Sequence, residues 1–147
     1  MIEVRAATED DVPRILKIVQ ESISPAWTHA ALLSEIFRVD SFFLIAVEDK
    51  KISGFVILRQ MADEGELLQI AVDKTTRRRG IAGQLMDVVL SRATECAIKS
   101  VFLEVRKSNE AAMCLYKKHG FEFVRYRKDY YSSPLEDAVV MVRGAFE

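Results

Sequence analysis

The sequence has few of the residues that build metal centres and disulfide frameworks. Its two cysteines, Cys96 and Cys114, fall in different predicted helices and form neither a Cys-x-x-Cys motif nor a Cys/His ligand pattern. We therefore expect no zinc site and no disulfide, and we expect both thiols to lie in the core. The two histidines, His29 and His119, stand alone in the sequence. We expect them to be structural, and we assign no metal.

The sequence also lacks an excess of one charge and any long apolar run. Its 21 basic and 22 acidic residues give a formal net charge of −1, and the one tight basic cluster is Arg77–Arg79. This balance argues against a nucleic-acid-binding surface. No run reaches the roughly 18 apolar residues of a membrane span, and residues 1–5 do not resemble the start of a signal peptide. We expect no membrane partner and a cytoplasmic location.

The remaining composition is that of a globular protein. Half of the residues are hydrophobic and 29% are charged, and the sequence shows no repeats, linkers or low-complexity segments. A chain of 147 residues is long enough to bury one core. We therefore expect one domain over residues 1–147, and the sequence does not specify its oligomeric state.

Hydrophobic periodicity predicts the elements of the N-terminal half. A strand at 2–5 precedes a helix that Thr8 caps and that runs to about Ser22. After a break at Ser24-Pro25-Ala26-Trp27, Thr28 caps a second helix. The apolar residues of that helix are Leu32, Leu33, Ile36 and Phe37. Three β-rich segments follow at 42–47, 51–61 and 64–72, and the first two form a hairpin.

The C-terminal half is predicted to alternate helices with strands. The longest helix covers about 80–97 and buries one side, which carries Ile81, Leu85, Val88, Val89 and Cys96. A strand at 100–105 precedes a helix that Ser108 or Asn109 caps and that Gly120 terminates. Strands at 121–130 and 137–143 close the domain. The order β-α-α-β-β-β-α-β-α-β-β predicts an α/β (α+β mixed) fold, with a mixed, mostly antiparallel central sheet and helices on both faces.

One strand-turn-helix segment can bind an anion. An apolar strand, Leu67–Asp73, is followed by Arg77-Arg78-Arg79-Gly80-Ile81-Ala82-Gly83. Because Gly80, Ala82 and Gly83 have almost no side chain, backbone amides at the helix N-terminus could approach a pyrophosphate. The alternative is that small residues merely allow close packing of the turn, and that the arginines are solvated.

The loop resembles the Arg/Gln-x-x-Gly-x-Gly/Ala motif of the GCN5-related N-acetyltransferases, and the predicted order of elements is also that of this family. The resemblance implies the acyl-CoA N-acyltransferase fold and acetyl-CoA as the cosubstrate. It implies cofactor contacts from the strand, the loop, the helix that follows the loop, and the next helix along the chain. The residues concerned are Ile70, Ala71, Val72, Arg77, Arg78, Arg79, Gly80, Ile81, Ala82, Gly83, Asn109 and Tyr116.

Glu104 and Tyr116 are the candidate catalytic residues. An amine must lose a proton before it attacks a thioester, and the departing thiolate benefits from receiving one. The resemblance implies Glu104 as the general base and Tyr116 as the general acid. Glu104 could instead pair with Arg106 or Lys107 on the surface, and Tyr116 could be a packed aromatic. Asn109 is a good helix cap in its own right, so both of its roles stay open.

One branch of the family has further similarities to this sequence. The stretch Glu-Val-Arg-x-Ser-Asn-x-Ala-Ala-x-x-Leu-Tyr at 104–116, the pair Tyr130-Tyr131 and the triplet Glu136-Asp137-Ala138 resemble the RimI-type ribosomal-protein alanine N-acetyltransferases. The resemblance implies transfer to the N-terminal α-amine of a protein, such as a ribosomal protein, with Trp27, Tyr130 and Tyr131 beside the peptide. Ordinary aromatic packing is the alternative for these three residues.

The segment between the tyrosines and the Glu-Asp-Ala triplet, residues 132–135, is shorter than this branch leads us to expect, so peptide selectivity stays open. Rival functions are a GNAT enzyme that acetylates a small-molecule amine or a lysine, and a non-catalytic acyl-CoA sensor. We do not expect Cys114 to carry the acyl group, because no histidine is placed to activate it.

Overall fold

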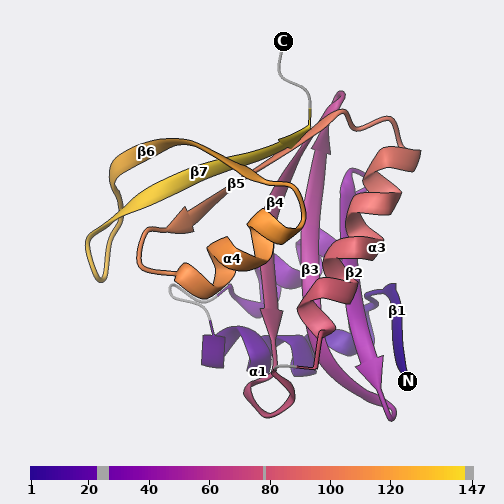
Figure 1. The fold of residues 1–147 in the computed structure, drawn as a ribbon. Helices are drawn as coiled ribbons and strands as arrows, with labels where there is room; N and C mark the ends of the chain where they lie inside the picture. Colours follow the sequence, from indigo (N-terminus) through magenta and orange to yellow (C-terminus); the bar gives the residue numbers. More distant parts are fainter. Residues whose placement is uncertain (23–26, 78, 145–147) are drawn as a thin grey trace.

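The structure is a computed structural model that describes residues 1–22, 27–77 and 79–144 (Figure 1). The predicted break at Ser24–Ala26 lies outside these residues. The strands are β1 (Ile2–Ala6), β2 (Ser41–Glu48), β3 (Lys51–Met61), β4 (Glu64–Val72), β5 (Ser100–Arg106), β6 (Glu122–Tyr131) and β7 (Glu136–Gly144). The α-helices are α1 (Val12–Ser22), α2 (His29–Ile36), α3 (Ile81–Glu95) and α4 (Glu110–Lys118), and short 3₁₀ turns cover Glu9–Asp11 and Lys74–Thr76.

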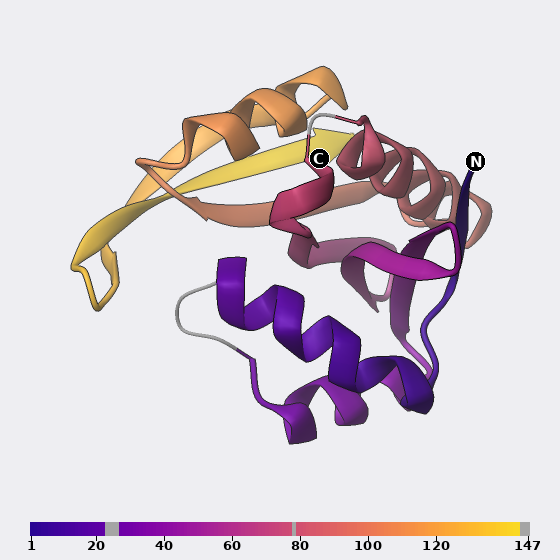
Figure 2. The ribbon, with the colours of Figure 1, turned by 90° about the horizontal axis from the view of Figure 1, so that it is seen from below.

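The strands form one sheet in the order β1-β2-β3-β4-β5-β7-β6, which confirms the mixed fold. Each neighbouring pair is antiparallel except β4 with β5. α1 and α2 cover one face of the sheet, and α3 and α4 cover the other (Figure 2). Among the described residues, none of the helices is long and apolar enough to cross a membrane.

Local capping interactions set the helix ends near the predicted positions. Thr28 accepts a hydrogen bond from Ala31 N (3.1 Å) at the start of α2, and Gly120 adopts a positive φ of 87° just after α4. Asp11 closes the first turn, because its carboxylate accepts from both Thr8 N (2.7 Å) and Thr8 Oγ1 (3.0 Å).

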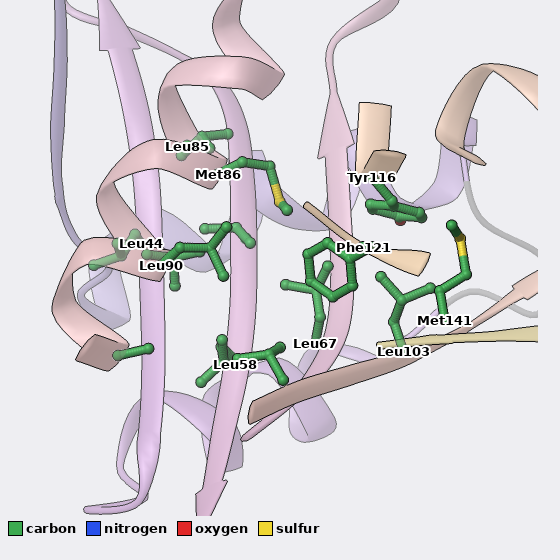
Figure 3. Packing of buried hydrophobic residues seen from close by; sticks show 14 of the residues in the cluster. Leu44, Leu58, Leu67, Leu85, Met86, Leu90, Leu103, Tyr116, Phe121 and Met141 are labelled. Carbon is green, nitrogen blue, oxygen red and sulfur yellow. The ribbon is translucent and has the colours of Figure 1, made fainter. Parts of the chain in front are cut away.

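Two apolar clusters fill the space between the sheet and its helices. The larger one joins α3 and α4 to the sheet, and Figure 3 shows Leu85 and Met86 from α3 on the same side as Tyr116, Phe121 and Met141. The smaller one lies under α1 and α2, where the rings of Phe43 and Phe55 pack at a tilt with their centroids 5.9 Å apart. Each fully buried Leu, Ile or Phe contributes roughly 1.5–3 kcal/mol, so the two clusters fix the sheet between its helices.

Two predictions about buried residues and one about a helix end were wrong. Cys96 and Cys114, expected in the core, are both exposed. α3 ends at Glu95, so Cys96 lies beyond the last helical turn rather than on its buried side. Phe37 was predicted to belong to the second helix, but α2 stops at Ile36, and Phe37 lies just past its end and is 67% exposed.

The sheet opens between its two parallel strands. β4 and β5 pair only through Glu64, Gly65 and Glu66 with Ser100, Val101 and Phe102. Beyond these residues the two strands diverge, as Figure 1 shows. The strands therefore separate in the middle of the sheet, next to the N-termini of α3 and α4.

Candidate active site

A cleft of about 540 Å³ occupies this opening between β4 and β5. It brings together residues from β4, β5, both α3 and α4, and the β6–β7 hairpin. Eleven of the residues predicted from the sequence line it: Trp27, Ile70, Ala71, Val72, Arg77, Ala82, Glu104, Asn109, Tyr116, Tyr130 and Tyr131. The cleft is large enough for an extended ligand that follows β4.

The N-terminus of α3 forms the basic end of the cleft. Gly80 is its N-cap with a positive φ of 77°, and a β-carbon there would meet no atom of the described residues within 4 Å. A β-carbon at Gly83 would meet only the side chain of His119, at 4.0 Å. The first turn contains no acidic residue. Because first-turn amides have no partners inside the helix, this surface fits a pyrophosphate, and Arg77, Gly80, Ala82 and Gly83 would hold it.

The other predicted loop residues have different surroundings. Arg79 is ion-paired with Glu48 at 2.8 Å. Ile81 is 2% exposed and belongs to the core. Neither residue lines the cleft, and Gly80 and Gly83 also lie outside its lining. Arg78 lies outside the described residues.

Asn109 caps α4 and also lines the cleft. Its Oδ1 accepts a hydrogen bond from Ala112 N at 3.2 Å, and the residue itself is exposed. Both roles considered from the sequence are therefore compatible with its position. The cap uses only the oxygen, so the side-chain NH₂ group can donate to a ligand.

Tyr116 lies on α4 with its ring in the larger core cluster. The residue is 8% exposed, and its ring packs against Phe121 at 5.8 Å between centroids. Burial raises the pKa of its phenol well above the ordinary value of 10.0. The hydroxyl therefore keeps its proton at neutral pH, as a proton donor must.

Glu104 lies on β5, with 14% of its side chain exposed. Its Oε2 accepts a hydrogen bond from Arg127 Nη1 at 2.9 Å. Of the two alternative partners considered from the sequence, Arg106 pairs with Glu136 at 3.2 Å, and Lys107 Nζ lies 5.1 Å from the Tyr126 ring centroid. Glu104 is therefore a partly buried carboxylate at the cleft with a partner from the neighbouring hairpin.

The paired tyrosines at the end of β6 line the cleft on the side of the β6–β7 hairpin. Their rings meet edge to face, with centroids 5.0 Å apart. The guanidinium of Arg127 lies 4.4 Å from the Tyr130 ring centroid, and that of Arg106 lies 4.5 Å from the Tyr131 ring centroid. Burial, followed by the charge of Glu104, raises the pKa of Tyr131 to about 12. We call this pair of tyrosines the aromatic wall.

Glu66 is the main residue of the cleft that the sequence did not reveal. It is the last residue of β4 to pair with β5, and it lines the cleft floor beside Glu104. Burial raises the pKa of its carboxyl, and the charge of Glu104 raises it further. In the sequence, Glu66 is marked only as a charged residue that stands just before an apolar run. Gln69 and Arg106 also line the cleft.

Comparison with known proteins agrees with this geometry. The model of the acetyltransferase (GNAT) family matches residues 12–121. The chain is 30% identical to a ribosomal protein bS18-alanine N-acetyltransferase of Haemophilus ducreyi, over 94% of this chain and 97% of that protein. It is 28% identical to an N-alpha-acetyltransferase of Saccharolobus solfataricus, over 95% and 91% of the two chains.

Solved structures show the same likeness. The Ard1 structure from Thermoplasma volcanium is 31% identical, with a TM-score of 0.92 and 99% of each chain covered. The ribosomal-protein-S18-alanine N-acetyltransferase of Escherichia coli is 27% identical, with a TM-score of 0.91 over 100% of this chain and 97% of that one. The chain therefore belongs to the GNAT acetyltransferase family and is an acetyl-CoA-dependent N-acetyltransferase.

Proposed function

We propose that this enzyme transfers the acetyl group to the N-terminal α-amine of a protein, and that a ribosomal protein is its substrate in the cytoplasm. The observation that carries the proposal is one cleft that combines Glu104, Tyr116 and the aromatic wall. The names of the similar bacterial and archaeal enzymes, which act on a ribosomal-protein alanine or on an α-amine, support it.

The proposed chemistry is direct attack of the amine on the thioester that acetyl-CoA supplies. Glu104 accepts the proton of the incoming ammonium, directly or through a water molecule, and Tyr116 donates a proton to the departing sulfur. The α3 N-terminus holds the pyrophosphate, and a backbone amide of Ile70–Val72 stabilises the charge that develops on the thioester oxygen. Holding both reactants in one cleft replaces a bimolecular encounter.

An α-amine suits this site better than a lysine does. The α-amine has a reference pKa of about 8 and lysine one of about 10.4, so deprotonating lysine at neutral pH costs about 3 kcal/mol more. A single carboxylate base can therefore deprotonate an α-ammonium more easily than a lysine ammonium. The aromatic wall also offers flat apolar surface to the first residues of a peptide.

The test compares three amines in a mass-spectrometric assay with acetyl-CoA. The first is a peptide with a free N-terminal alanine, the second is its Nα-formylated copy with one internal lysine, and the third is spermidine. The proposal predicts acetylation of the first at a rate at least about 100-fold above the other two, in keeping with the pKa difference. Faster acetylation of spermidine or of the lysine would overturn it.

Glu104→Gln is the matched variant for the same assay. The proposal predicts that the variant keeps a low but measurable turnover, far below that of the wild type, and the wild-type Kd for acetyl-CoA. A wild-type protein that binds acetyl-CoA but acetylates no amine would instead favour the sensor. The ribosomal substrate is tested by mass spectrometry of ribosomal proteins from cells with and without this enzyme, where one N-terminus should lose its acetyl group.

A further inference from the structure

Arg127, on β6, contacts two separate parts of the cleft at once. Its Nη1 donates to Glu104 Oε2 on β5 at 2.9 Å, and its guanidinium lies 4.4 Å from the ring centroid of Tyr130. The strand between them, β7, separates β5 from β6 in the sheet, so this contact spans a strand. One side chain thus connects the candidate base to the aromatic wall.

We propose that Arg127 is a positioning residue, which fixes the carboxylate of Glu104 for proton transfer and couples it to peptide bound on Tyr130. The proposal rests on the proposed function, because it needs Glu104 as the base for an α-amine. It adds a residue that touches neither the acetyl group nor the amine and that acts through Glu104.

The need for positioning comes from Glu66. Phe102 is the register partner of Glu66, and Glu104 lies two residues further along β5, so the two carboxylates project from the same face of neighbouring strands. Their charges interact across the cleft floor. Repulsion from Glu66 favours a Glu104 rotamer turned away from it, and Arg127 supplies the opposite charge on the far side. It engages only Oε2, so Oε1 can accept the proton.

The expected effect of Arg127 on the reaction rate is larger than its expected effect on the stability of the fold. The Arg127 side chain is 45% exposed, and ion pairs of this kind contribute about 0–1 kcal/mol to folding. Orientation has a larger effect on rate, since a displacement of about 1 Å in a reacting group can lower turnover about 100-fold. Loss of Arg127 should therefore reduce turnover far more than stability.

The link to Tyr130 makes the geometry of the base depend on the peptide. Tyr130 is 45% exposed, and Arg127 lies against its ring. A peptide residue that packs on this ring restricts the same side chain that holds Glu104. Arg106 makes the equivalent contact with the Tyr131 ring, but its ion pair is with Glu136 and not with the base.

The experiment is a double-mutant cycle with steady-state kinetics on the alanine peptide. The variants are Arg127→Met, Arg127→Lys and Glu104→Gln, and the double variant combines Arg127→Met with Glu104→Gln. Arg125→Met is the matched control, because Arg125 is exposed on the same strand and does not line the cleft. For each we measure kcat, the peptide KM, the Kd for acetyl-CoA and Tm.

Arg127→Met should lower kcat about 10-fold, an effect within the range of a misplaced catalytic group, and leave the Kd for acetyl-CoA and Tm at wild-type values. Arg127→Lys, which keeps the charge, should recover most of the rate. Arg125→Met should match the wild type. In the Glu104→Gln background, Arg127→Met should lower kcat no further, because both changes act on one step.

The proposal is overturned if Arg127→Met keeps the wild-type kcat, or if it lowers kcat equally in both backgrounds. A rise in peptide KM alone would assign Arg127 to peptide binding and also overturn it. These outcomes differ from failure of the proposed function, in which the wild-type enzyme itself acetylates no α-amine and both proposals fall.

Discussion

Replacement of Tyr116 by Phe gives a sharp test of the proposed proton donor. The ring is 8% exposed and packs against Phe121, so the variant keeps every apolar contact and loses only the hydroxyl. Within the described residues, the structure gives that hydroxyl no hydrogen-bond partner, so its removal leaves no buried group unsatisfied. We expect the free energy of unfolding to change by less than about 1 kcal/mol.

The effect on catalysis should be much larger. General acid catalysis contributes at least about 100-fold to rate, which corresponds to about 2.7 kcal/mol of transition-state stabilisation. Tyr116→Phe should therefore lower kcat about 100-fold, while the Kd for acetyl-CoA changes less than about twofold. Because burial raises the pKa of Tyr116, the phenol stays protonated at every working pH, so the wild-type rate should show no alkaline loss from this group below about pH 10.

The assay is steady-state kinetics with thermal unfolding of the same samples. Tyr126→Phe is the control, since this tyrosine is 54% exposed on β6 and does not line the cleft. It loses the same hydroxyl and should keep the wild-type kcat. A Tyr116→Phe variant that is folded and retains at least half of the wild-type kcat would refute the assignment of the general acid.

Three further predictions concern the acetyl-CoA site and the fold. Gly83→Asp puts a carboxylate in the first turn of α3, so it should stabilise the helix by up to about 1 kcal/mol. The same carboxylate should raise the Kd for acetyl-CoA, measured by calorimetry, at least about 10-fold. A variant that binds acetyl-CoA as tightly as the wild type would contradict an anion site there. Asn109→Ala should lower the free energy of unfolding by about 1 kcal/mol through loss of the cap. Asn109→Asp should keep the cap but bind acetyl-CoA more weakly than the wild type, because it lacks the NH₂ donor. If both variants keep the wild-type Kd for acetyl-CoA, Asn109 has only the capping role. The hydrogen bond from Arg5 lowers the pKa of Asp11 below its ordinary value. The Asp11 carboxylate therefore makes its full contribution to the free energy of unfolding above about pH 4, and this contribution is lost as the pH falls through the lower pKa of the folded state. In urea titrations, Asp11→Asn should therefore cost about 1–2 kcal/mol at pH 7 and progressively less below pH 4; a constant cost would contradict this linkage.

Features with local causes could be predicted from the sequence. Thr28 and Asn109 cap helices through bonds within three residues of their own position, and the strand limits of β3 and β4 follow from β-rich segments bounded by polar turns. The candidate site was also largely predictable, because Glu104 and Tyr116 belong to a segment with a specific pattern. The structure brings both to one cleft.

Features that depend on distant contacts could not be predicted. Cys96 and Phe37 fit the apolar periodicity of their helices, but each helix stops before reaching them, so periodicity alone misplaces them. In the sheet, β7 lies between β5 and β6. Other strand orders would fit the same hydrophobic pattern, so the sequence does not determine this one. Arg127 reaches Glu104 only because of that strand order, and Glu66 matters only because the sheet opens beside it.

The central claim is that the α3 N-terminus binds the pyrophosphate and directs the thioester into the opening between β4 and β5. A crystal structure with coenzyme A tests it most directly. We predict pyrophosphate oxygens within hydrogen-bond distance of the amides of Ala82 and Gly83, and the sulfur in the cleft within reach of the Tyr116 hydroxyl. A pyrophosphate bound away from α3, or a sulfur on the opposite face of the sheet, would contradict the account.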